Sequence, residues 1–217
     1  MLNVFSTFLS LQGESIFQGK PCYFIRLAGC SLKCVYCDSR EACVSPGVQL
    51  SVDEILDLVA VSKVNVVEVT GGEPLIQQAS FRLLSRLSDV FKHVLLETNG
   101  SLSVEHVDPR VHVVMDVKCP DSGMGDSFFL NNLILLEDRS HELKFVISSK
   151  RDFDWVCGFV SENGLYNREL VVSPSFSYVS IRDLADWVLS GPYPFRIQTQ
   201  LHKLIWPEGE KEKRLVL

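Results

Sequence analysis

The sequence lacks several features that mark large classes of protein. No apolar run reaches the roughly 18–20 residues that a membrane-spanning helix needs. Residues 1–11 contain no lysine, no arginine and no small-residue cleavage site of the kind found in signal peptides. Internal repeats and low-complexity tracts are also missing. We therefore expect a cytoplasmic protein without a membrane segment.

Basic residues are in deficit as well. The chain has 21 Lys and Arg against 27 Asp and Glu, whereas a broad nucleic-acid-binding face needs clustered positive charge, so we expect no nucleic-acid partner. With 217 residues, 46% of them hydrophobic, the chain suits a single domain over residues 1–217. It is somewhat short for a complete (β/α)8 barrel, which typically has roughly 250 residues. Residues 207–217 form a charged C-terminal tail.

Seven cysteines are present, and an odd number in a chain without a signal peptide does not suit a disulfide framework. Cys30, Cys34 and Cys37 lie close together, so their thiolates can converge on one metal centre. The other four cysteines are interpreted as small buried hydrophobic residues: Cys22, Cys43, Cys119 and Cys157.

The cysteine spacing alone leaves three kinds of metal site open. A structural zinc site needs a fourth ligand, which Cys43 or Cys22 could supply. A closed four-cysteine iron–sulfur cluster for electron transfer is a second alternative, although the bacterial ferredoxin spacings differ. A three-cysteine iron site is the third, and it leaves one coordination position free for a substrate or cofactor.

Apolar, β-branched runs bounded by turn residues predict strands that are buried on both faces of a parallel sheet. They alternate with helix-period segments, the clearest of which opens with a capping box at residues 51–54. This alternation favours an α/β domain with right-handed crossovers. The predicted strands are 22–27, 64–69, 93–96, 111–117, 143–147, 169–172 and 194–197, and the predicted helices are 51–59, 78–91, 128–136, 153–161 and 181–189.

Polar or glycine-containing segments follow the ends of these strands. In parallel α/β folds this edge of the sheet carries ligands and chemistry, so we expect one shared site there. The segments are 70–74, 97–100, 116–120 and 173–175, and a further strand ends at Arg26, just before the three cysteines.

Two motifs and their flanks resemble a known family. Cys30-x3-Cys34-x2-Cys37, with an aromatic residue before the last cysteine, resembles the signature of radical S-adenosylmethionine (SAM) enzymes. The Thr-Gly-Gly-Glu-Pro segment at 70–74 resembles their glycine-rich SAM-binding segment. The flanks narrow the resemblance to the 7-carboxy-7-deazaguanine synthase family and cover most of the chain. They are residues 11–15, 19–30, 37–39, 97–100, 116–120 and 200–206.

This resemblance implies a trimmed, incomplete (β/α) barrel of the radical SAM type, with the site at the C-terminal strand ends of a parallel sheet. It also implies that Cys30, Cys34 and Cys37 hold three irons of a 4Fe-4S cluster, while the fourth iron chelates S-adenosyl-L-methionine. Reductive cleavage of that cofactor yields the radical that starts the reaction. The residues implied to bind the cofactor are Gly71, Gly72, Glu73, Lys118 and Ser173.

A substrate and a reaction are implied as well. Members of the family are lyases that convert 6-carboxy-5,6,7,8-tetrahydropterin to 7-carboxy-7-deazaguanine and ammonia by radical-mediated ring contraction, in queuosine and 7-deazapurine biosynthesis. Arg26 is the candidate for a bidentate contact with the pterin carboxylate. Residues 1–20 are expected to form an N-terminal substrate-binding segment. The implied substrate-binding residues are Gln12, Gly13, Glu14, Arg26, Thr70 and His202.

Magnesium near the substrate carboxylate is a further implication. Its usual ligand in the family is a threonine two residues after the last cluster cysteine, where this chain has Ser39. A serine hydroxyl also suits a hard cation. Ser15 is a second departure, because glycine is common there. The resemblance also implies an electron donor such as flavodoxin or ferredoxin, and a homodimer.

Two rival functions explain the same cysteines. A glycyl-radical activating enzyme shares the three-cysteine motif and the small size, but it leaves Arg26 and residues 12–14 unexplained. A non-catalytic zinc or iron–sulfur module that only binds a partner is the other rival. Anaerobic reconstitution with iron and sulfide separates them, because a zinc module stays colourless and a binding module has a spectrum that ignores SAM.

Overall fold

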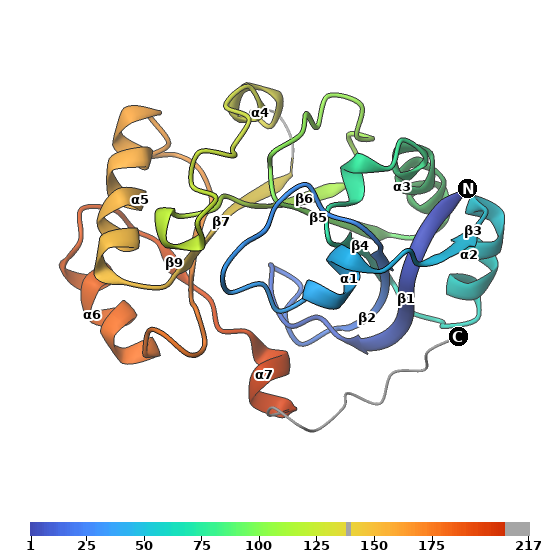
Figure 1. The fold of residues 1–217 in the computed structure, drawn as a ribbon, viewed down its shortest axis with the longest axis horizontal. Coiled ribbons are helices and arrows are strands. Elements are labelled where there is room, and N and C mark those ends of the chain that lie inside the picture. Colours follow the sequence, from blue (N-terminus) through green and yellow to red (C-terminus); the bar gives the residue numbers. More distant parts are fainter. Residues whose placement is uncertain (138–139, 207–217) are drawn as a thin grey trace.

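The structure is a computed structural model that describes residues 1–137 and 140–206. Within these residues, nine strands form one sheet in the order β3-β1-β2-β4-β5-β6-β7-β8-β9 (Figure 1). The sheet is mostly parallel and is not closed into a barrel, so the expected incomplete (β/α) barrel is confirmed. The predicted charged tail at 207–217 lies outside the described residues.

The predicted strands are all present, and each pairs in parallel with its neighbours of this set. Their apolar runs are buried because helices cover one face of the sheet and a second apolar cluster lies on the other. The strands are β2 (Pro21–Leu27), β4 (Val66–Gly71), β5 (His93–Thr98), β6 (His112–Asp116), β7 (His141–Ile147), β8 (Leu170–Pro174) and β9 (Arg196–Ile197).

Two strands were not predicted from the sequence. β1 (Leu2–Leu11) pairs antiparallel with β2, and β3 (Val48–Leu50) pairs antiparallel with β1. An irregularity between Val4 and Ser6 shifts the register of β1, which breaks the period-two pattern that identifies a strand. Residues 2–11 of the segment 1–20 are therefore part of the sheet, and Val4 belongs to the main core.

Helices α2 (Val52–Ala60), α3 (Ala79–Val90), α5 (Lys150–Glu162) and α6 (Ile181–Ser190) confirm four of the predicted helices. In Figure 1, α2 and α3 lie beside the β1–β4 half of the sheet, and α5 and α6 lie beside β7 and β9. The predicted capping box forms between Ser51 and Glu54. No helix among the described residues combines the length and apolar character that membrane crossing requires.

The remaining helical elements are short. α4 (Asn132–Leu135) covers only part of the predicted 128–136, because the Asn132 and Leu133 N–H groups bond the carbonyls of Phe129 and Leu130, three residues back, so a turn precedes the helix. The others are α1 (Arg40–Val44), α7 (Leu201–Ile205) and the 3-10 turns η1 (Pro74–Ile76) and η2 (Pro120–Ser122).

Apolar side chains form two separate clusters. The main core lies between the sheet and its helices and includes Val67 and Leu96. Successive side chains of a strand point to opposite faces, so Val66 and Leu95 belong to the second, inner cluster. That cluster fills the inner face along the first half of the strands and leaves the strand ends for polar side chains. Its members are Phe8, Phe17, Cys22, Phe24, Val66, Leu95 and Val114.

The four cysteines outside the motif divide into two groups. Cys22 and Cys119 are fully buried in the inner and the main cluster, which confirms their interpretation as small hydrophobic residues. Cys157 is partly buried at the edge of the main core. Cys43 is also partly buried, and it lines the pocket described next.

Candidate functional site

A pocket of about 670 Å³ opens where the parallel strands end, at the edge of the sheet that the polar segments predicted. Its size suits a small molecule. Most of the residues singled out from the sequence line it: Gln12, Gly13, Glu14, Arg26, Cys30, Cys34, Cys37, Ser39, Thr70, Gly71, Gly72, Lys118 and His202.

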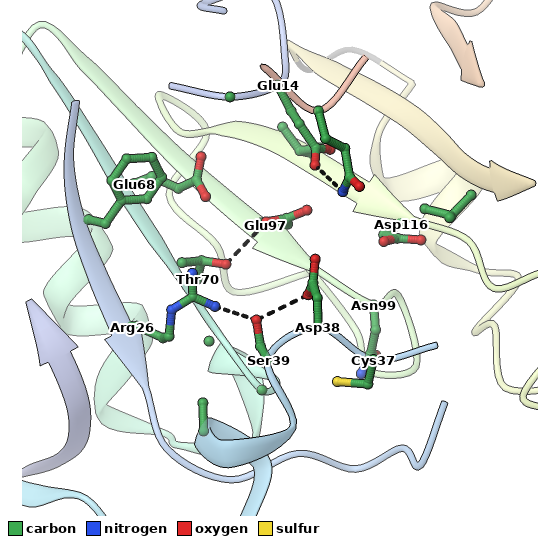
Figure 2. A pocket seen from close by; sticks show the side chains of 18 of the residues that line it. Glu14, Arg26, Cys37, Asp38, Ser39, Glu68, Thr70, Glu97, Asn99 and Asp116 are labelled. Atoms are coloured by element: carbon green, nitrogen blue, oxygen red, sulfur yellow. Dashed lines mark hydrogen bonds between the residues drawn. The ribbon is translucent and has the colours of Figure 1, made fainter. Parts of the chain in front are cut away.

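Strand alternation places a polar layer on the pocket wall. Glu68, Glu97 and Asp116 each follow a member of the inner apolar cluster by two residues, so they lie on the same face of the sheet. Thr70 continues this face at the end of β4, and Lys144 of β7 pairs in register with Asp116. Figure 2 shows the acidic side chains around one common space.

Lys144 is the central cation of this layer. Its side chain is 3% exposed, and its Nζ lies 2.5 Å from Glu97 Oε1, 2.7 Å from Glu14 Oε2 and 3.5 Å from Asp116 Oδ2. Burial alone would lower the pKa of Lys144, but these carboxylates raise it well above its ordinary value. Burial likewise opposes ionisation of Glu14, yet Lys144 keeps the pKa of Glu14 below its ordinary value. The layer therefore carries paired charges.

Glu68 differs from its acidic neighbours because it bonds a neutral group. The Gln12 Nε2 donates to Glu68 Oε2, while the Gln12 Oε1 accepts from the Glu14 N–H over 3.1 Å. Burial, together with the negative charge of Glu97, raises the pKa of Glu68 to about 8. At neutral pH Glu68 is therefore mostly an uncharged acid, and both ends of the Gln12 amide are engaged within the protein.

Thiols line one end of the pocket. Cys30, Cys34 and Cys37 lie on the loop that follows β2, and the Cys43 Sγ of α1 lies 3.8 Å from the Cys37 Sγ. In the described part of the chain, no three His, Cys, Asp or Glu side chains converge as a site for a single metal ion. Three thiols spread around a common space are a ligand set suited to an iron–sulfur cluster.

Two glycines bring the end of β4 into direct contact with the loop that carries Cys30, Cys34 and Cys37, called the thiol loop below. A Cβ on Gly72 would lie 2.0 Å from the Gly29 carbonyl oxygen and 2.9 Å from the Cys30 Cβ. Gly71 has a φ of 142°, and a Cβ there would lie 2.2 Å from the Leu27 carbonyl oxygen. Only glycine permits this approach, so the backbone at 71–72 borders the pocket beside Cys30.

Two predicted cofactor-binding residues do not line the pocket. Glu73 is fully buried, and its carboxylate accepts hydrogen bonds from the Thr98 hydroxyl at 2.9 Å and the Asn99 N–H at 2.7 Å. It thereby ties the glycine segment to the end of β5. Ser173 of β8 is fully buried as well. Direct contact of Glu73 or Ser173 with a cofactor stays a prediction.

Arg26, Ser39 and Asp38 form a hydrogen-bonded chain at another side of the pocket (Figure 2). The Arg26 guanidinium donates to the Ser39 Oγ, which donates to Asp38 Oδ1 over 3.2 Å. The Lys203 Nζ lies 3.2 Å from Asp38 Oδ2. The Asp38 side chain is 53% exposed, and Lys203 and Arg26 lower the pKa of Asp38 to about 2. The Ser39 hydroxyl thus lies between a cation and a carboxylate.

Helix α7 covers the pocket from the C-terminal end of the described chain. The Leu201 N–H donates to the Gly13 carbonyl over 3.0 Å, and the Gln200 Nε2 donates to Glu14 Oε1 over 2.7 Å. A Cβ on Gly13 would lie only 2.1 Å from the His202 Nδ1. Glycine at position 13 therefore leaves room for His202 in the pocket.

The sequence placed Glu97 and Asp116 in segments expected at the site without giving either a role, and it did not point to Glu68 or Lys144. A signal was available, because each ionisable side chain interrupts or ends an apolar strand. Such a side chain is costly to bury unless it is paired. The partners, however, could not be read from the sequence.

Comparison with known proteins extends these observations. Residues 24–113 match the model of the Radical SAM superfamily. The chain is 44% identical over 208 residues to the 7-carboxy-7-deazaguanine synthase of Chlorobaculum tepidum, with 94% of each chain covered. It is 37% identical to the synthase of the same name from Koribacter versatilis, over 97% of this chain and 99% of the relative.

Solved structures with a similar fold include QueE from Escherichia coli, with a TM-score of 0.73 and 22% identity over 92% of this chain and 93% of that one. SuiB from Streptococcus suis, solved with bound S-adenosylmethionine, gives a TM-score of 0.52 and 15% identity over 85% of this chain and 49% of SuiB. At these identities the likeness concerns the fold alone.

The contact between Gly13 and His202 generates a first prediction. In Gly13→Ala the new Cβ displaces the His202 ring, which loosens α7 and speeds hydrogen exchange of the Leu201 amide several-fold. The control is Gly158→Ala in α5, where a Cβ meets nothing within 4 Å. It should stabilise the protein by about 1 kcal/mol without changing that exchange. Equal exchange at Leu201 in both variants would contradict the role of Gly13.

The raised pKa of Glu68 generates a second prediction. Between its unfolded pKa near 4.5 and its folded pKa of about 8, the folded protein holds a proton that the unfolded chain has lost. The contribution of Glu68 to the free energy of unfolding therefore falls as pH rises through this window. Glu68→Gln should remove that decline in urea titrations, relative to wild type and to the exposed control Glu162→Gln. Parallel stability curves for wild type and Glu68→Gln would refute it.

Proposed function

The chain belongs to the 7-carboxy-7-deazaguanine synthase family of radical SAM enzymes, and on this premise we propose that it converts 6-carboxy-5,6,7,8-tetrahydropterin to 7-carboxy-7-deazaguanine and ammonia. One observation carries the proposal. The three thiols of the motif and the polar layer around Lys144 border the same pocket of about 670 Å³. A centre held by the thiols would therefore lie next to a small polar substrate.

The thiol end of the pocket fits a 4Fe-4S cluster. Cys30, Cys34 and Cys37 would hold it, and the close packing of Gly72 on Gly29 and Cys30 keeps the glycine segment next to that end. When bound, the cluster and SAM supply a radical that abstracts hydrogen from the substrate. The protein has to orient these groups and exclude water.

Residues at the ends of β4 and β6 are the candidates to bind SAM. The backbone at Gly71 and Gly72 is open to the pocket, and Lys118 is fixed by Asp116, with its Nζ 2.9 Å from Asp116 Oδ2. The Glu73 carboxylate accepts hydrogen bonds from Thr98 and Asn99, which hold the adjacent Gly71–Gly72 segment in place. We infer a positioning role for Glu73, and we retain Ser173 as a candidate contact.

Other residues that line the pocket suit a carboxypterin. Arg26 can meet the substrate carboxylate in a bidentate contact. Glu14 accepts hydrogen bonds and thus suits the N–H groups of a pterin ring, while Thr70 can add a hydroxyl contact. Gln12 and Gly13 shape the wall, and His202 closes it.

The same pocket offers possible ligands for a magnesium ion. Ser39 and Asp38 offer the hard oxygen ligands that this ion prefers. The Arg26 guanidinium donates to the same Ser39 hydroxyl. We therefore propose that Ser39 binds magnesium only when Arg26 turns toward the substrate carboxylate.

The reaction also indicates what an electron-donor partner has to supply. The product and ammonia together contain all the atoms of the substrate, so the conversion consumes no net electrons, and a donor of the flavodoxin or ferredoxin class has to provide only the activating electron. A homodimer and a cytoplasmic location complete the proposal. The seven free cysteines suit a reducing compartment.

The rival functions find less support. A glycyl-radical activating enzyme must admit a polypeptide, whereas α7 packs over this pocket through Leu201 and Gln200. A non-catalytic metal module has no need of the buried charges around Lys144.

The test of the proposed function is product analysis. Reconstituted under anaerobic conditions with iron, sulfide and a reductant, the wild type should form 7-carboxy-7-deazaguanine from the carboxypterin and SAM, as measured by mass spectrometry. Cys34→Ala should lose bound iron and SAM cleavage while keeping its circular dichroism spectrum, and Cys157→Ala should keep all three. SAM cleavage without ring-contracted product would refute the substrate. Full iron content in Cys34→Ala would refute the cluster ligand.

The role of Arg26 is tested separately. Arg26→Ala should weaken carboxypterin binding by about tenfold or more, because a bidentate charged contact is lost, and should leave SAM binding within about twofold. Calorimetry on the reconstituted protein measures both, with the exposed Arg182→Ala as control. Loss of SAM binding with unchanged pterin affinity would show that Arg26 lies on the cofactor side of the pocket.

A further inference from the structure

Lys144 lies in the middle of β7, between two apolar neighbours, and only 3% of its side chain is exposed. An ammonium group is buried at this depth only where opposite charges replace its water shell. A buried lysine is unnecessary for a strand of this kind, since an apolar residue would pack there at no electrostatic cost. The presence of a lysine at position 144 therefore indicates that its positive charge has a function.

The carboxylates around Lys144 come from three different elements. Glu14 lies on the loop after β1, Glu97 at the end of β5 and Asp116 at the end of β6. The closest contacts are those to Glu97 and Glu14, at 2.5 and 2.7 Å. One ammonium group therefore draws together side chains that are 130 and 47 residues away from it in the chain.

The second oxygen of each of these two carboxylates has its own donor. The Gln200 Nε2 donates to Glu14 Oε1 over 2.7 Å, and the Thr70 Oγ1 donates to Glu97 Oε2 over 3.1 Å (Figure 2). Both carboxylates are thus held at both oxygens, and both line the pocket. Free lone pairs on these oxygens can accept hydrogen bonds from a ligand but cannot donate any.

We propose that Lys144 is a positioning residue that fixes the carboxylates of Glu14 and Glu97 as a rigid pair of hydrogen-bond acceptors, which selects ligands with several N–H groups along one edge. This inference rests on the proposed function, because a pterin has such an edge. Lys144 also lines the pocket, but its ammonium group is engaged by the two carboxylates, so it does not need to touch the substrate. Acceptors that are fixed before binding lose less conformational freedom when the ligand arrives.

The experiment compares the binding of two ligands to one protein. Wild type, Lys144→Met and the exposed control Lys150→Met are reconstituted with iron and sulfide. Calorimetry then gives the dissociation constants of SAM and, in the presence of SAM, of the carboxypterin. Lys144→Met should bind the carboxypterin about tenfold or more weakly, with its iron content and SAM affinity within about twofold of wild type. Lys150→Met should match wild type in all three measurements.

A double variant separates positioning from a general loss of structure. In Lys144→Met/Glu97→Gln the lost positive charge is matched by a lost negative one, so this variant should fold even if Lys144→Met does not. Its pterin affinity should lie at least about fivefold below that of Glu97→Gln, because Glu14 is still released. Its loss should nevertheless be smaller than the product of the two single losses, because Lys144 acts partly through Glu97.

The outcomes distinguish the two proposals. If the wild type binds the carboxypterin and Lys144→Met or the double variant binds it equally well, the role of Lys144 is wrong and the proposed function stands. If a folded Lys144→Met lost iron, SAM and pterin binding to a similar extent, the role of Lys144 would be structural and the positioning role would be wrong. A wild type that binds SAM but no carboxypterin would overturn both proposals.

Discussion

A buried ammonium group, that of Lys144, allows the inner face of the sheet to carry several acidic side chains at once. Lys144 keeps the partly buried Glu14 ionised, and Lys118 together with Lys144 keeps the buried Asp116 ionised. Glu68 shows what happens in the same layer when the partner is a neutral amide, since burial raises the pKa of Glu68 to about 8. The charge pattern of the pocket, and with it the kind of ligand that it can bind, depends on this arrangement.

The pocket brings two chemically different kinds of group together. Soft thiols and ionised or polar oxygen and nitrogen groups line the same space. The packing of Gly72 against Gly29 and Cys30 holds the thiol loop against β4, and Glu73 ties the glycine segment to β5. A radical SAM enzyme needs this proximity, because the group that generates the radical and the molecule that receives it must be held side by side without water between them.

Much of this arrangement followed from patterns along the chain, but not all of it. The apolar runs predicted the parallel strands, and the segments after them predicted the edge of the sheet that carries the pocket. β1 was missed because its bulge disturbs the alternation, and α4 was predicted too long because turn bonds from Asn132 and Leu133 to carbonyls three residues back replace the first helical turn. Motif position predicted Glu73 as a cofactor contact, but not the hydrogen bonds that its buried carboxylate accepts from Thr98 and Asn99.

Features that depend on short-range order could be predicted from the order of residues alone. Cys30, Cys34 and Cys37 lie within one loop, and the period-two alternation of a strand decides which of its side chains share a face. Which charges meet becomes visible only in three dimensions, because the partners of Lys144 come from three elements far apart in the chain. Coulomb energies and desolvation costs depend on distances in space, so neither the pairing of Lys144 nor the neutral state of Glu68 could be derived from residue order.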